Sequence, residues 1–170
     1  MQKSSSIVLA VCAALALCLG IGYLVTSGSP PQITQQQAVS MLDEMNAAVE
    51  RKDVGGIMRH VSTAPDQKIA GMRGDQLRFI LTRGLRSGGK MSSQTSNVQF
   101  NASENNATLD FDLFVTSKEG DALTELYKGH IRLGLKRMDV PRLLGLFQGK
   151  EWLIVSAEHT GRDLNSFGEY

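Results

Sequence analysis

Apolar residues recur at helical spacing in the first half of the chain after residue 33. Thr34 and Gln37 form a capping-box pattern, and the apolar positions 39, 42, 45 and 49 that follow predict an amphipathic helix. The run Val54-Gly55-Gly56 is predicted to end it. A short second helix is predicted over residues 57–61, and a third is predicted to begin at Asp75 and to end at Gly88-Gly89.

The spacing of the apolar residues changes from helical to alternating after residue 90. Apolar residues occupy the odd positions from 107 to 115, whereas Asp110 and Asp112 lie on the other side, which predicts a half-buried strand. A weaker strand is predicted over residues 92–100 and a long one over 123–136. Residues 143–147 and 152–159 are predicted to form a hairpin around Gln148-Gly149-Lys150. The last strand is apolar on both faces, so it should be covered twice.

The order of these elements resembles a known superfamily. Its similarity rests on the helical start "MLDEMNAAVERKDVGGIMRHVS", the long antiparallel strands and the closing "GKEWLIV" at residues 149–155. This plan resembles the nuclear transport factor 2-like superfamily, also called the SnoaL-like or cystatin-like cone, over about residues 33 to 160. The resemblance implies an α+β fold in which a curved antiparallel sheet wraps around N-terminal helices and leaves a pocket between them. Residues 140–145 depart from that plan.

An uncharged apolar run of 19 residues, 7–25, precedes this region and is long enough to cross a bilayer. We therefore divide the chain into a cytoplasmic tail, an anchor or signal segment, a stalk, a cone-shaped domain and a C-terminal tail: residues 1–6, 7–26, 27–32, 33–162 and 163–170. Lys3 is the only charge before Asp43, which predicts that the domain lies outside the cytoplasm, periplasmic or extracellular. Cleavage of the segment would make the protein secreted.

Charge and cysteine content exclude several kinds of function. Lys3 is one of 18 basic residues, so the chain after it carries 17 against 17 acidic residues. A neutral domain is not expected to bind nucleic acid. Cys12 and Cys18 both lie in the apolar run, so the folded part has no disulfide and no cysteine ligand. The histidines are dispersed, and we expect no metal and no cofactor.

The candidate pocket residues are Tyr127, Glu125, Trp152, His60 and His159. Tyr127 and Glu125 share the apolar face of the strand predicted over 123–136, from which a hydroxyl or carboxylate could orient a ligand. The alternatives are that the Tyr127 hydroxyl lies at the edge of the core, that Glu125 reaches solvent and that Trp152 is a core residue. Alternation along the last strand predicts that Glu158 and His159 cannot both face one pocket.

Two polar surfaces are also predicted. Asp110 and Asp112 should lie opposite a basic row on the next strand, where cross-strand pairing explains both sets, namely Lys128, His130 and Arg132. Five basic residues in and around the third helix could contact an acidic partner or lipid head groups, or could simply be solvated: Arg73, Arg78, Arg83, Arg86 and Lys90. Asn101 and Asn106 match the glycosylation acceptor pattern.

These observations predict a membrane-anchored extracytoplasmic binding or assembly module. Its working surface would be a pocket for a small apolar ligand or a homodimer formed through the sheet. The alternative is a small-molecule lyase, isomerase or hydrolase that uses Tyr127 and Glu125, with His60 or His159 from the rim. The superfamily contains enzymes, ligand carriers and assembly modules, so the resemblance indicates a scaffold and no particular activity.

Overall fold

A computed structural model describes residues 32–87, 89–142 and 147–161. The predicted tail, anchor segment and first part of the stalk lie outside these residues, as do residues 143–146 and the predicted C-terminal tail. Among the helices of the described ranges, none is both long enough and apolar enough to span a membrane.

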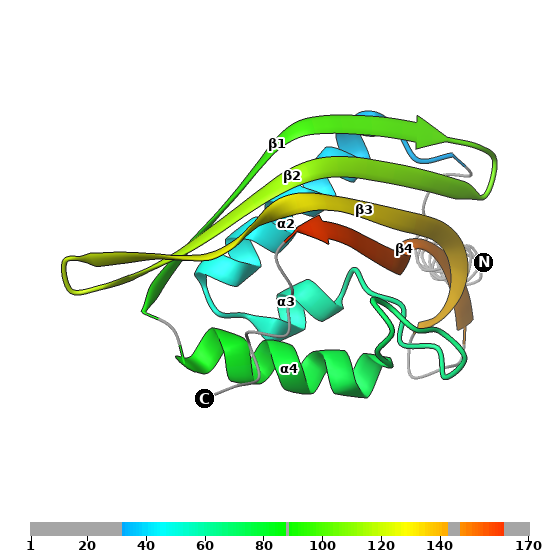
Figure 1. The fold of residues 1–170 in the computed structure, drawn as a ribbon. Coiled ribbons are helices and arrows are strands. Elements are labelled where there is room, and N and C mark those ends of the chain that lie inside the picture. Colours follow the sequence, from blue (N-terminus) through cyan, green and yellow to red (C-terminus); the bar gives the residue numbers. More distant parts are fainter. Residues whose placement is uncertain (1–31, 88, 143–146, 162–170) are drawn as a thin grey trace, which may run out of the picture. The chain divides into compact units, whose positions relative to one another are not determined.

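Within the described residues, three helices precede the sheet: α2 (Gln35–Glu50), α3 (Val54–Met58) and α4 (Gly74–Ser87) (Figure 1). The predicted capping box is confirmed, because the Gln37 amide donates to Thr34 Oγ1 at 3.2 Å and the Thr34 amide donates to Gln37 Oε1 at 3.0 Å.

The second helix differs from its prediction. It begins at Val54, so the glycines at 55 and 56 lie inside it instead of ending the first helix. Asp53 caps it by accepting a hydrogen bond from the Gly56 amide at 2.9 Å. A side chain at Gly56 would lie within 2.7 Å of the Asp53 carboxylate. The glycine therefore permits the close approach of the cap.

Four strands form one sheet in the order β1-β2-β3-β4, with bounds β1 (Lys90–Ala102), β2 (Asn106–Glu119), β3 (Ala122–Arg142) and β4 (Phe147–Gly161). The first three strands are confirmed and are longer than predicted. The hairpin predicted around Gln148-Gly149-Lys150 is wrong, because these residues lie inside β4. Their exposure alternates, with Gly149 buried between two exposed neighbours, as in an extended strand.

The chain divides into two compact units, Pro31–Arg137 with Trp152–Tyr170, and Met1–Pro30 with Met138–Glu151. In the second unit, the described residues are the end of β3 and the start of β4. Every residue of the site and the surfaces described below belongs to the first unit.

The core of the first unit lies between the helices and one face of the sheet (Figure 1). Leu109 of β2 is fully buried and Leu135 of β3 nearly so, and both belong to one cluster with Leu42 of α2. The inward face predicted for β2 is therefore confirmed. Trp152, Leu153 and Ile154 are consecutive and all buried, so β4 is covered on both faces, as expected.

The free edge of β4 is also partly paired. Val61 forms a parallel bridge with Ile154. The Ser62 amide donates to the Ile154 carbonyl at 2.9 Å, and the Ile154 amide donates to the His60 carbonyl at 2.8 Å. This short pairing satisfies backbone groups that an exposed edge would leave open.

Among the described residues, two bulges interrupt the pairing of β1 with β2 and of β2 with β3. One lies in β1 between Ser96 and Gln99, and the other places Leu126 of β3 as an extra residue opposite the step from Val115 to Thr116 of β2. A bulge bends its strand and changes which face the following side chains occupy. The second bulge determines which residues reach the site.

Candidate functional site

A cavity of about 280 Å³ lies between α4 and the sheet. It is lined by residues of α2, of α4 and of all four strands, among them Ile80 and Gly84 of α4, Leu113 of β2 and Ala157 of β4. The lining is almost entirely apolar. An apolar cavity of this size excludes charged molecules and favours a small hydrophobic one.

Among the described lining residues, Tyr127 contributes the one group whose polar atom is deeply buried. The residue is only 8% exposed, and its hydroxyl has no hydrogen-bond partner within the described part of the chain. Burial raises the pKa of this hydroxyl above its usual value of 10.0. The group is therefore neutral at physiological pH and can donate a hydrogen bond.

Glu125 does not share this cavity. The register pairs Val115 with Tyr127 but Thr116 with Glu125, so Leu126 is the extra residue of the bulge. Alternation is interrupted there, and Glu125 lies on the opposite face of β3 from Tyr127, exposed to solvent. The expectation that the two residues share a face is wrong for this reason.

The other three candidates are separated from one another. His159 lines the cavity and is exposed, whereas Trp152 lies in the hydrophobic core. His60 lies outside the lining, and its Nε2 is 3.2 Å from Glu44 Oε2. The structure thus brings Tyr127 and His159 to one cavity.

Glu158 also lines that cavity, next to His159. The expectation that alternation keeps these neighbours apart is therefore wrong. Both residues are exposed and lie close to the end of β4, where the strand itself borders the cavity, so consecutive residues reach it. A group that borders an open rim is hydrated, unlike the Tyr127 hydroxyl.

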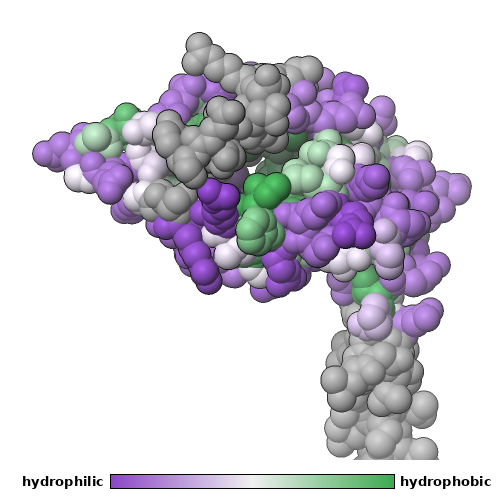
Figure 2. All heavy atoms as spheres, turned by 60° about the horizontal axis from the view of Figure 1, so that its bottom comes forward, coloured by the Kyte–Doolittle hydropathy of each residue, from purple (hydrophilic) through white to green (hydrophobic). Residues whose placement is uncertain are grey.

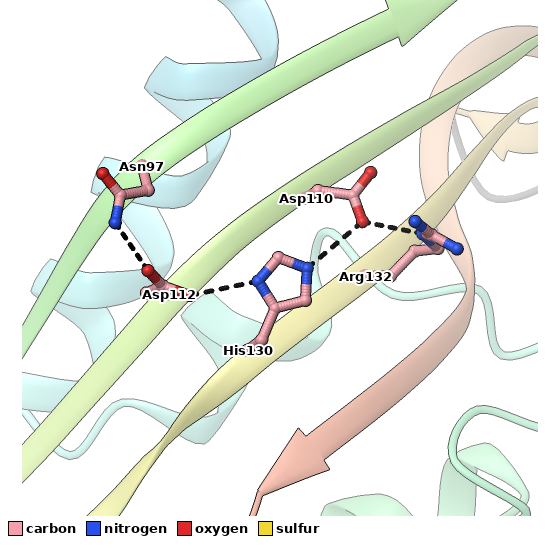
Figure 3. A network of polar contacts seen from close by, with 5 residues as sticks. All are labelled: Asn97, Asp110, Asp112, His130 and Arg132. Carbon is pink, nitrogen blue, oxygen red and sulfur yellow. Dashed lines mark hydrogen bonds and ion pairs between the residues drawn. The ribbon is translucent and has the colours of Figure 1, made fainter.

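The opposite face of the sheet carries a chain of polar contacts (Figure 3). Asn97 Nδ2 donates to Asp112 Oδ2 at 2.7 Å, and His130 lies with Nδ1 3.0 Å from Asp112 and Nε2 3.5 Å from Asp110. Arg132 Nε donates to Asp110 at 2.7 Å. The pairing predicted between the carboxylates and the basic row is confirmed for His130 and Arg132.

These contacts stabilise the ionised form of Asp112. The hydrogen bond from Asn97 and, after it, that from His130 hold the pKa of this carboxyl below its ordinary value of 3.8. A carboxylate with a lowered pKa and filled hydrogen bonds is a poor general acid or base at neutral pH. Within the described ranges, no group of three metal-ligating side chains is placed to hold an ion.

Few features of the amino-acid sequence mark the residues of α4 that line the cavity. Gly84 is the one available signal, because glycine inside a helix usually marks a close approach or an open space. No residue type marks Leu126 as a bulge, since leucine suits either face of a strand.

Comparison with solved structures identifies the fold as nuclear transport factor 2-like. A nuclear transport factor 2-like superfamily protein from Salmonella enterica serovar Typhimurium superposes with a TM-score of 0.59 at 13% identity, covering 79% of this chain and 95% of that one. A protein of unknown function from Mycobacterium tuberculosis gives 0.58 at 15% identity, covering 76% and 72%. A candidate dehydratase of the same fold family from Streptomyces avermitilis gives 0.55 at 11%, covering 74% and 94%.

No protein-family model and no curated protein matches the amino-acid sequence. The structural likeness, at identities of this order, defines the fold alone. Because one fold can host unrelated functions, the chemistry of the cavity is the better indicator of function.

Proposed function

We propose that this protein is a binding module for a small apolar molecule that carries one hydrogen-bond acceptor. The observation that supports this most strongly is the Tyr127 hydroxyl, which is buried beside an apolar cavity and has no partner within the described residues. A buried polar atom without a partner costs about 1–3 kcal/mol. The hydroxyl oxygen itself is covered in this structure, so a ligand carbonyl or ether oxygen would remove that cost after a movement of the lining that uncovers it.

The lining favours binding over catalysis. General acid–base chemistry needs at least two polar groups that converge on the reacting atoms. Here Tyr127 is the buried polar group, while Glu158 and His159 border the cavity as exposed residues. Apolar walls with one directional donor are typical of a carrier or sensor, which orients its ligand without transforming it.

We further propose that residues 7–26 anchor the domain to a membrane, with the domain outside the cytoplasm. The support is the uncharged run of 19 residues after Lys3. Retention of the full-length chain in membranes after an alkaline carbonate wash would support a retained anchor. Release into the supernatant would show a cleaved or peripheral segment.

Filling the cavity tests the binding proposal. Ala157 is half-buried in the lining, so Ala157→Phe should place a ring in the cavity and reduce the binding of acetylnaphthalene, an apolar ketone, at least tenfold. The matched control is Ser156→Phe, which adds the same ring at the exposed neighbouring position. Binding would be measured by equilibrium dialysis. Equal affinity in the two variants would show that the ketone binds elsewhere.

A further inference from the structure

Helix α4 exposes two large hydrophobic side chains. Phe79 is 67% exposed and Ile80 is 45% exposed. Ile80 also lines the cavity, so the exposed apolar surface adjoins the binding site. Figure 2 shows the side of the molecule that lies at the bottom of Figure 1, with an apolar patch among hydrophilic side chains.

Basic residues surround this apolar pair. Arg83 and Arg86 follow Phe79 by four and seven positions and therefore lie on the same side of the helix, and Arg78 precedes it. Asp75, the acidic residue of the helix, lies in its first turn, 3.4 Å from Arg73. We call Arg78, Phe79, Ile80, Arg83 and Arg86 the α4 patch.

A third exposed hydrophobic residue, Leu123 at the β2–β3 turn, provides a contrast. Leu123 is 69% exposed, as much as Phe79, but the charged residues around it are mainly acidic: Glu119, Asp121 and Glu125, against Lys118 directly opposite it on β2. Equal apolar exposure thus occurs in a basic setting at α4 and in an acidic setting at the turn. A negatively charged surface would distinguish the two sites.

We propose that the α4 patch docks on an anionic lipid surface. Phe79 and Ile80 would enter the head-group boundary while the arginine guanidinium groups contact lipid phosphates, the arrangement expected of an interfacial amphipathic helix. A second copy of the same patch is a poorer partner, because its arginines would meet like charges.

The proposal rests on the membrane anchor proposed above. Residues 27–34 separate the end of the apolar segment from α2, and eight residues span at most about 30 Å. An anchored domain therefore stays close to the bilayer, where each arginine near an anionic surface adds about 1 kcal/mol, or about fivefold, to the docked population. Because Ile80 belongs to both the patch and the cavity lining, an apolar ligand dissolved in the lipid would meet the cavity at this helix.

The test uses the full-length chain in vesicles that contain a doxyl-labelled quenching lipid. Phe79→Trp reports on the α4 patch, and Leu123→Trp is the matched control at an equally exposed apolar position. The buried Trp152 gives the same background in both variants. Vesicles of phosphatidylcholine alone are compared with vesicles that also contain phosphatidylglycerol.

Docking predicts that quenching of the Phe79→Trp variant in anionic vesicles is at least twice that of the Leu123→Trp variant, and that it falls in neutral vesicles. Adding Arg86→Gln should lower the docked-to-free ratio about fivefold. Equal quenching of the two tryptophan variants would overturn the proposal, as would quenching that ignores lipid charge. A change of emission that depends on protein concentration, without quenching, would also overturn it and indicate a second copy.

The carbonate wash separates this outcome from failure of the anchor. A chain that is released by the wash but is still quenched in anionic vesicles would have no anchor and would nevertheless dock through α4. A chain that is retained and shows no difference between the two variants would be anchored and would not dock.

Discussion

Polar groups on the two faces of this sheet have opposite environments. On the outer face, the side chains of Asp110 and Asp112 are partly exposed, at 18% and 45%, and each has partners at 2.7–3.5 Å. On the inner face, the Tyr127 hydroxyl is buried and has no partner in the described chain. Solvent would satisfy the outer groups even without their neighbours, whereas the inner group depends on something that the described residues do not supply. The more conspicuous polar cluster is therefore the weaker indicator of function.

The largest predicted effect is a difference in stability between variants at two neighbouring residues of β2. Leu109 is fully buried and Asp110 faces the other side of the sheet. Leu109→Ala should lower the free energy of unfolding by about 2–5 kcal/mol through lost apolar contact and a new cavity. Asp110→Ala, the matched control, should lower it by about 1 kcal/mol or less. Chemical denaturation measures both, and equal losses would contradict the assignment of the faces.

Removing the Tyr127 hydroxyl should change the free energy of unfolding by a smaller amount and in the opposite direction. Tyr127→Phe removes a buried polar atom without a partner, so the free energy of unfolding of the ligand-free chain should stay constant or rise by up to about 2 kcal/mol. Thermal and denaturant unfolding of the two proteins measure the change. A loss of stability of more than about 1 kcal/mol would show that the hydroxyl makes a structural hydrogen bond.

A pair of variants at Asn97 should sharpen the description of the outer face. Asn97 has φ of 54°, a left-handed conformation that a residue with Cβ adopts at a cost. Its side-chain amide donates a hydrogen bond to Asp112. Asn97→Ala should lose about 1 kcal/mol, whereas Asn97→Gly keeps the conformation accessible and should lose less. If the glycine variant is the less stable, the bulge does not need this conformation.

The smallest predicted effect is a dependence on pH. Because the pKa of Asp112 in the folded chain lies below its ordinary value of 3.8, the ionised carboxylate stabilises the folded state at higher pH. That contribution is lost as the pH falls below 3.8 and the carboxyl becomes protonated. Asp112→Asn should therefore flatten the acid end of the plot of unfolding free energy against pH. An unchanged slope would show that Asp112 titrates alike in both states.

The sequence predicted the elements of the fold better than it predicted the site. Capping at Thr34 and alternation along β2 are local patterns, and both are confirmed. The hairpin at Gly149 was wrong because glycine in a buried strand looks the same in sequence as glycine in a turn.

The set of residues that line the site depends on the register between β2 and β3, and the amino-acid sequence does not reveal that register. Tyr127 and Glu125 have the spacing of one strand face, yet a single extra residue at Leu126 separates them. Nothing in the composition of β3 marks that insertion, since it arises from pairing with β2. The exposure of Phe79, by contrast, follows from helical spacing, because Phe79 lies on the side of α4 opposite the partly buried Leu77 and Leu81.

The most direct measurement of the central claim compares two ligands and two proteins. Acetylnaphthalene and isopropenylnaphthalene have nearly the same shape, but only the first carries a carbonyl oxygen. We predict that the wild-type chain binds the ketone about 3–10-fold more tightly than the hydrocarbon and that Tyr127→Phe binds both equally. If the wild type shows no preference, or if the preference survives in Tyr127→Phe, the buried hydroxyl does not contact the ligand and the proposed site is wrong.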